Sequence, residues 1–146
     1  MSIRFSVQSG NLGTNNVEEL KKWIEQVVGN RGGVVCNINY LLCDDDYLLE
    51  VNRKYLNHDT CTDIITFDYV VGNLISGDIL ISTERVGENA DKFEVSYDEE
   101  LRRVIIHGVL HLLGQGDKSD VEAKEMRRQE DEALAMFHEE RSRQNA

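Results

Sequence analysis

The feature that most constrains this chain is an apolar stretch from Ile105 to Asp117 (IIHGVLHLLGQGD), which carries two histidines four positions apart. On a helix, this spacing stacks the rings of His107 and His111 on one face, one turn apart. Gly114 predicts the end of that helix, because glycine adopts the left-handed cap conformation at little cost. The turn that follows can bring Asp117 back beneath the two rings.

Two imidazoles and a carboxylate that converge in this way can bind a divalent metal ion. Zinc is the expected metal, with a fourth position open to water. The alternative is that these are core histidines with hydrogen-bond partners, because an H-x-x-x-H pair alone is weak evidence. The glycine break and the following acid favour the metal site. So does the cost of burying two of the chain's four histidines in one apolar segment.

The residue after the first histidine bears on the type of chemistry. Metalloproteases with the H-E-x-x-H motif carry a glutamate there as the general base. This chain has Gly108 at that position, so the metzincin-like spacing H-x-x-x-H-x-x-G-x-x-D lacks the base. A peptidase is therefore disfavoured.

Composition limits the class of protein. A length of 146 residues with 40% hydrophobic content predicts one domain with a proper core. The net charge of -11 disfavours a generic nucleic-acid binder, although a local basic patch remains compatible with it. No apolar run reaches the roughly 18 residues of a membrane span. The N-terminal residues lack a signal-peptide layout, and the three cysteines (Cys36, Cys43 and Cys61) predict reduced thiols in the cytoplasm.

Hydrophobic periodicity predicts five helices and four strands, and their order along the chain is β-α-β-α-β-β-α-α-α. The strands are expected at 2–7, 34–43, 62–71 and 74–82. The helices are expected from about 17 to 28, 45 to 55, 83 to 93, 97 to 113 and 121 to 140, with a frayed tail from about 141. This order implies a single α+β domain, in which helices pack on a four-stranded mixed sheet and one helix carries the metzincin-like motif.

Two sequence patterns predict where helices start. Asp44, Asp45 and Asp46 form either a metal cluster or an N-cap with an acidic first turn, and the cap is the commoner use. Ser96 is expected to cap the helix that carries the histidines, with Glu99 completing a capping box.

Four ordered blocks of this sequence resemble the YbeY family of endoribonucleases, which are ribosomal RNA maturation factors. HGVLHLLGQGD is similar to the family signature H-G-x-L-H-L-x-G-Y-D-H, and Gly77-Asp78-Ile79 is similar to its G-D-I strand. Asn52-x-x-Tyr55 and the segment 59–67 (DTCTDIITF) are similar to N-x-x-Y-R and D-x-P-T-D-V-L-S-F. The positions similar to the helix after the histidines are Glu122, Ala123, Met126 and Glu130.

The resemblance implies a metal-dependent endoribonuclease that cuts single-stranded RNA. Its implied roles are maturation of the 3′ end of small-subunit ribosomal RNA and ribosome quality control. The partners are then ribosomal RNA and the ribosome or its proteins, with no DNA or membrane partner. The implied metal ligands are His107, His111 and Asp117, because the family's third histidine falls on Asp117. A carboxylate there makes the metal a weaker Lewis acid than a third imidazole would. Either metal-bound hydroxide or the RNA's own hydroxyl would be the nucleophile.

An arginine that is implicated in the family's activity falls on Leu56, and Arg53 or Lys54 are the nearby substitutes. Arg103 lies one turn before His107 and is a candidate to hold a substrate phosphate. Its alternative role is an ion pair with a glutamate such as Glu99.

The segment before the third strand supplies further candidates for the cleft. Thr62 and Asp63 either line the cleft and orient a metal-binding histidine or cap the start of the strand. His58 is a further candidate for the same cleft.

Two other functions are compatible with the sequence. One is a metal-bearing ribosome-assembly protein that does not cut RNA, which Leu56 and the acidic charge would suit. The other is a metal-dependent hydrolase of another substrate, such as a small-molecule amidase.

Overall fold

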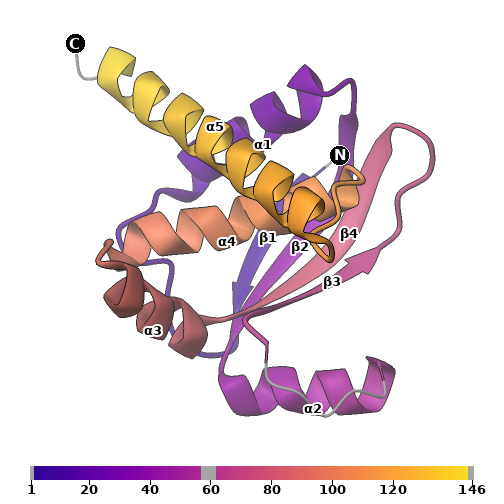
Figure 1. Cartoon of the computed structure of the whole chain (residues 1–146), viewed down its shortest axis with the longest axis vertical. Helices are drawn as coiled ribbons and strands as arrows, with labels where there is room; N and C mark the ends of the chain where they lie inside the picture. The colour runs from indigo at the N-terminus through magenta and orange to yellow at the C-terminus, as the bar shows by residue number, and fades with distance from the viewer. Residues whose placement is uncertain (1, 57–61, 145–146) are drawn as a thin grey trace.

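The computed structural model describes residues 2–56 and 62–144. In these residues the fold is a four-stranded sheet with helices packed around it (Figure 1). The strands are β1 Ser2–Val7, β2 Val34–Cys43, β3 Ile64–Asp68 and β4 Leu74–Ser82. The helices are α1 Val17–Asn30, α2 Asp45–Leu56, α3 Thr83–Phe93, α4 Tyr97–Leu112 and α5 Asp120–Gln144. The predicted α+β class and order of elements are confirmed.

The sheet is mixed, and its strand order is β1-β2-β4-β3. β2 pairs in parallel with β1, to which the helical crossover α1 connects it, and also in parallel with β4, whereas the hairpin partner β3 pairs antiparallel with β4. The hairpin therefore places β3 at the edge of the sheet, beyond β4. This edge strand contacts α4, the helix that carries both histidines.

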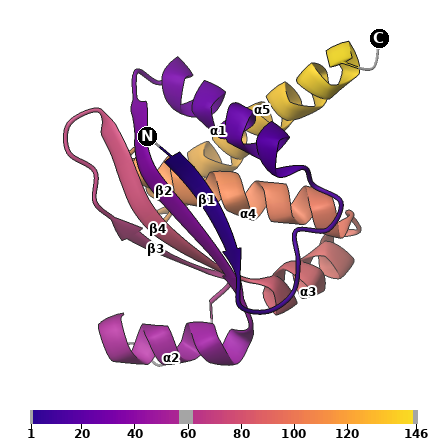
Figure 2. The same ribbon diagram turned by 180° about the vertical axis from the view of Figure 1, so that it is seen from behind.

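The two faces of the sheet are covered differently. One face carries Ile38 and Ile79, which belong to the main core together with the buried sides of α1, α4 and α5. Figure 2 shows α1 and α4 along this side of the sheet, while α2 lies apart from them at the other side. The opposite face has a smaller cluster, in which Ile65 and Leu80 pack with Leu48 of α2.

Side-chain caps mark the helix starts, and the cap at Ser96 is the predicted one. Asn16, Ser82 and Ser96 each accept a hydrogen bond from a backbone N–H in the first turn of the helix that follows. Asp44 accepts one from Tyr47 N at 2.8 Å, so the three aspartates begin α2 in the expected way. Only half of the capping box at Ser96 forms, because the Glu99 carboxylate instead contacts Arg102 and His138.

Two predicted boundaries are wrong. The third strand was expected over 62–71, but β3 covers only Ile64–Asp68. It ends at Asp68 because the carboxylate of this residue accepts a hydrogen bond from Val70 N at 2.8 Å and turns the chain. The last helix was expected to end at about 140, but α5 continues through Gln144. Arg143 pairs there with Glu139 and Glu140 at 3.4 and 3.6 Å, and these one-turn contacts support the last turn.

Two cysteines lie in the described part of the chain, and both Cys36 and Cys43 are free thiols. Burial and the charges of Asp44 and Asp45 raise the pKa of Cys43 to about 12. Cys61 lies outside the described residues. Among the helices described, none has both the length and the apolar character that crossing a bilayer requires.

Candidate metal centre

Helix α4 brings the two histidines to the surface of the core. It is apolar on the side that meets the sheet, where Gly108 allows a close approach: a Cβ at this position would lie 2.9 Å from Ile79 Cδ1. His107 and His111 follow on the adjacent side, and their side chains are 21% and 28% exposed. Both rings are therefore anchored by a buried helix yet open to a ligand.

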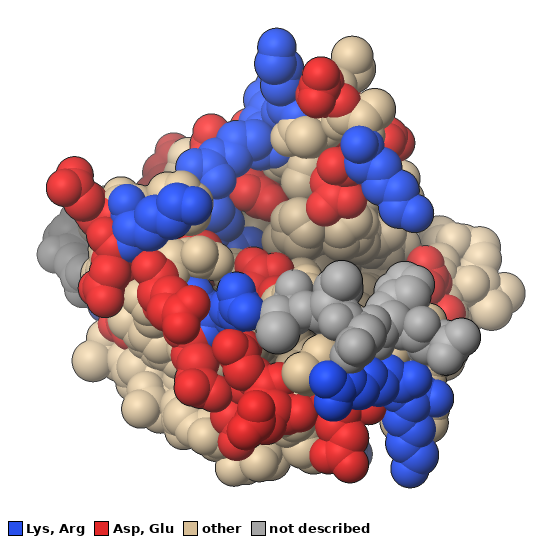
Figure 3. Space-filling view, turned by 60° about the horizontal axis from the view of Figure 1, so that its bottom comes forward, with Lys and Arg blue, Asp and Glu red and all other residues tan. Residues whose placement is uncertain are grey.

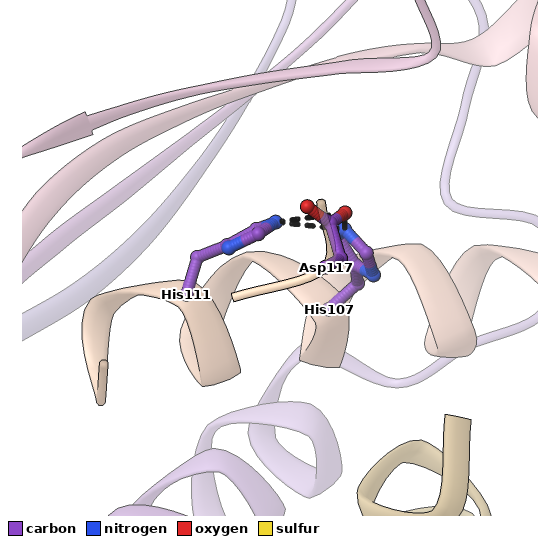
Figure 4. A group of neighbouring side chains, drawn as sticks. All are labelled: His107, His111 and Asp117. Atoms are coloured by element: carbon purple, nitrogen blue, oxygen red, sulfur yellow. Dashed lines mark hydrogen bonds and ion pairs between the residues drawn. The ribbon is translucent and has the colours of Figure 1, made fainter. Parts of the chain in front are cut away.

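The three predicted ligands lie together (Figure 4). Asp117 Oδ2 is 3.3 Å from His107 Nε2 and 3.4 Å from His111 Nε2, and the two Nε2 atoms are 3.0 Å apart. In tetrahedral zinc sites with bonds of about 2.1 Å, neighbouring ligand atoms are separated by about 3.4 Å. The donor set and its spacing thus fit a divalent ion with one position left free.

The turn after α4 holds Asp117 in this place. Gly114 has a positive φ of 98°, and Gln115 N donates to Leu110 O at 3.0 Å, which closes the helix as the sequence predicted. The Gln115 side chain in turn accepts a hydrogen bond from Gln129 Nε2 of α5 at 2.9 Å. The short path from His111 to Asp117 is therefore tied to both helices.

The start of α5 supports the same turn through a reciprocal cap. Ser119 Oγ accepts from Glu122 N at 3.1 Å, and Glu122 Oε1 accepts from Ser119 N at 3.2 Å. The S-x-x-E pattern is visible in the sequence but did not enter our predictions. It fixes the start of α5 three residues after Asp117.

A buried carboxylate of α5, Glu130, lies behind His107. Its Oε2 atom is 2.6 Å from His107 Nδ1, and its side chain is only 6% exposed. An ionised carboxylate can only accept, so Nδ1 carries the proton and Nε2 directs its lone pair towards Asp117 and His111. The sequence comparison placed Glu130 in a matching helix but assigned it no role, and no local pattern links residues 23 positions apart.

The environment of His107 also changes its acidity. Burial lowers its pKa, but the hydrogen bond from the ring to Glu130 and the charges of Glu130, Asp117 and Asp63 outweigh that effect. The net result is a raised pKa of His107. The same negative charges that favour a proton on the ring would also attract a metal cation to it.

Arg103 does not project freely into the site. Its Nη1 donates to Glu130 Oε1 at 2.8 Å and its Nη2 to Asp131 Oδ1 at 2.8 Å. Of the two roles considered for Arg103, the structure favours an ion pair, but the partners are on α5 and not Glu99, which pairs with Arg102. Arg103 is thus joined to His107 through Glu130.

The other predicted site residues are distributed unevenly. Thr62 and Asp63 lie just before β3; the Thr62 hydroxyl donates to Ile64 O at 3.3 Å, and the Asp63 backbone carbonyl accepts from Ser82 N at 2.9 Å. The charge of Asp63 nevertheless reaches His107, as the pKa of that ring indicates. Arg53 is exposed in the last turn of α2, across the sheet from α4, and His58 lies outside the described residues.

Edge strand β3 forms the opposite wall of the site. Three of its residues, Ile64, Thr66 and Asp68, line a surface hollow together with His111. Alternate residues of a strand point to the same face, so these three side chains share the side towards α4. Thr66 and Asp68 were not predicted as site residues, and the pairing that brings β3 beside His111 is a long-range one.

Comparison with known proteins agrees with this geometry. The family model described as "Endoribonuclease YbeY" matches residues 6–138. A relative named Endoribonuclease YbeY from Flavobacterium johnsoniae is 53% identical over 124 residues, which cover 85% of this chain and 89% of the relative. Another of the same name from Parabacteroides distasonis is 45% identical over 140 residues, covering 96% and 99%.

A solved structure supports the fold. The solution structure of a Thermotoga maritima protein superimposes with a TM-score of 0.68 at 30% identity, and the match covers 97% of this chain and 93% of that one. The relatives span nearly the same length as this chain, so the similarity includes the sheet, α4 and the turn that carries Asp117. From its sequence and its fold, this chain belongs to the YbeY endoribonuclease family.

Proposed function

We propose that this chain is a metal-dependent endoribonuclease that cuts single-stranded RNA during ribosomal RNA maturation, including the 3′ end of small-subunit RNA, and in ribosome quality control. One observation carries the proposal: the ligand atoms of His107, His111 and Asp117 all lie within 4.8 Å of one another in a chain of the YbeY family. Relatives that match most of the chain are named endoribonucleases.

Zinc is the metal we propose for this site, one ion per chain. Two imidazole nitrogens and one carboxylate oxygen form a borderline ligand set that suits zinc, and three protein ligands leave a position for water or substrate. Asp117 adds a negative charge where a third imidazole would be neutral. The ion in this site is thus expected to be a weaker Lewis acid than one held by three histidines.

A metal held in this way lowers the pKa of bound water and polarises a phosphoryl oxygen. The protein's own contribution is to hold the ligands. Glu130 keeps a proton on His107 Nδ1, so that Nε2 is available to the ion, and Arg103 holds Glu130 in place. The nucleophile is either water or the RNA's own 2′-hydroxyl.

The remaining candidates receive narrower roles in this proposal. Arg103 acts through Glu130 rather than by holding a phosphate. Asp63 and Thr62 border the site at the start of β3, where Asp63 contributes to the negative field around His107. Arg53 and His58 are left as candidate contacts to substrate outside the metal centre.

The partners we propose are ribosomal RNA and the ribosome, which place the protein in the cytoplasm, where Cys36 and Cys43 would stay reduced. The net charge of -11 opposes long-range attraction of RNA. Figure 3 shows a face on which acidic side chains form a band, with basic side chains along its margins. Contacts close to the metal centre must therefore provide much of the affinity.

The test is to incubate the purified protein with single-stranded and structured RNA, with and without a chelator. We expect cleavage of the single-stranded RNA only, lost with chelator and in His111→Ala. RNA binding without cleavage would point instead to a non-cutting ribosome-assembly factor. No engagement of RNA, with the metal still bound, would point to a hydrolase of another substrate.

A further inference from the structure

An RNA strand that reaches the metal centre meets a strongly acidic environment. Asp117 is one of the three proposed ligands and Glu130 lies directly behind them, while Asp63 acts on His107 through its charge. Glu100, two turns before His107 on α4, is another buried carboxylate, with 5% of its surface exposed. Phosphates are anions, so a strand that is to lie here needs a cation from the protein.

Arg103 is poorly placed to supply that cation. Both of its terminal nitrogens already donate to carboxylates, to Glu130 and to Asp131, and its side chain is only 19% exposed. Releasing it would remove one of the two partners of the buried Glu130 carboxylate and leave only the contact to His107, which is costly in a buried site.

Arg127 of α5 is available for this role. It is exposed, and among the described residues it forms no hydrogen bond or ion pair. It precedes Glu130 and Asp131 by three and four positions, so it lies one turn away on the same side of α5. These two neighbours contact His107 and Arg103 of α4, so this side of α5 borders the metal centre.

The charge of Arg127 is among those that act on Glu100 of α4, which agrees with its place on the side of α5 that borders α4. Burial raises the pKa of Glu100, and the Asp63 and Glu130 charges raise it further, whereas Arg103 and Arg127 both lower it. Arg127 is therefore close enough to act on a carboxylate of the α4 side that carries Arg103 and His107.

We propose that Arg127 binds a phosphate of the RNA strand beside the metal centre. The inference rests on the proposed function, since it names a contact to that substrate. A guanidinium presents a planar fork that matches a phosphate with two parallel hydrogen bonds. Its position one turn from Glu130 lets it hold the strand next to His107 without disturbing the Arg103–Glu130 pair.

Lys118 is the rival cation, because it follows Asp117 directly and is also exposed without a partner among the described residues. A lysine there would act as a mobile point charge at the turn, whereas Arg127 projects from a regular helix beside the buried Glu130. The test must therefore include both positions.

The experiment measures cleavage of a short fluorescein-labelled single-stranded RNA by the zinc-loaded protein and by Arg127→Ala, Arg127→Lys, Lys118→Ala and Arg128→Ala. Arg128→Ala is the matched control, since it removes the same charge from the adjacent position, where the side chain is 56% exposed and pairs with Glu125 and Glu132. We expect kcat/KM to fall about tenfold in Arg127→Ala, with partial recovery in Arg127→Lys. The control should stay within about twofold of the unmodified protein.

Two further readouts separate a phosphate contact from a structural effect. Zinc content should be unchanged in Arg127→Ala, and its RNA affinity should depend less steeply on salt, by about 0.7 in the log–log slope. Equal kinetics in Arg127→Ala and Arg128→Ala, or a loss confined to Lys118→Ala, would overturn the inference while leaving the nuclease proposal standing. Failure of the unmodified protein to bind or cut the RNA would overturn both.

Discussion

Glu130 Oε2 lies 2.6 Å from His107 Nδ1, so a buried carboxylate on the last helix sets the orientation of a ring on the preceding one. The opposite oxygen of Glu130 is held by Arg103 at 2.8 Å. Arg103, Glu130 and His107 therefore form a continuous chain that ends at the proposed metal ion. This contact determines which nitrogen of His107 faces Asp117.

Replacing Glu130 with Gln should weaken zinc binding by about 10- to 100-fold. A neutral amide orients the His107 ring less firmly than the carboxylate and adds no negative charge behind it. Zinc affinity can be measured by competition with a chelating dye. Glu132→Gln is the matched control: its side chain is 57% exposed, it pairs with Arg128, and it should leave the affinity unchanged. Equal affinities in both variants would show that Glu130 does not support the site.

The ligand set itself predicts metal content. The unmodified protein should hold about one zinc ion per chain, and His107→Ala or Asp117→Ala should lose most of it, since two remaining ligands rarely retain zinc. Elemental analysis of the purified variants measures this directly. Full occupancy in the His107→Ala/Asp117→Ala double variant would show that the ion lies elsewhere.

A rise in pH should lower the folding stability of the metal-free protein but strengthen zinc binding. The pKa of His107 is raised above its ordinary 6.5, so its protonated form is favoured by folding. This contribution to stability is fully present below the unfolded-state pKa and is lost as the pH rises through the raised folded-state value. Zinc, which needs the neutral ring, should bind more tightly over the same rise.

Thermal unfolding of chelator-treated protein across this pH range provides the measurement. His107→Gln should remove that part of the pH dependence while the unmodified protein retains it. A pH profile that is the same in both proteins would contradict the raised pKa of His107.

The close approach of α4 to the sheet depends on Gly108. Gly108→Ala would place a Cβ 2.9 Å from Ile79 Cδ1 and 3.2 Å from Ile64 Cδ1, which should cost about 1–3 kcal/mol of unfolding free energy. The same change at Gly87 of α3 meets no atom within 4 Å and should stabilise the protein by about 0.5–1 kcal/mol. Chemical denaturation measures both, and similar values at the two sites would argue against tight packing at Gly108.

Local patterns in the sequence determined most elements of this fold. The limits of β1, β2 and β4 and the caps at Asn16, Ser82 and Ser96 follow from side-chain periodicity and from the hydrogen bonds of nearby residues. Local sequence also determined that His107 and His111 lie one turn apart and that the helix ends at Gly114, because one helical turn and one cap involve only neighbours in sequence. The predicted convergence of Asp117 depended on this short turn as well.

Tertiary structure decided the contacts between distant segments. Nothing near Arg103 or His107 in the sequence identifies Glu130 as their common partner, and Glu99, the local candidate, pairs instead with Arg102 and His138. The position of β3 at the sheet edge, which places Thr66 and Asp68 beside His111, is likewise set by long-range strand pairing. The physical reason is that periodicity and capping act over one or two turns, whereas these partners meet only when α5 packs on α4 and β3 pairs with β4.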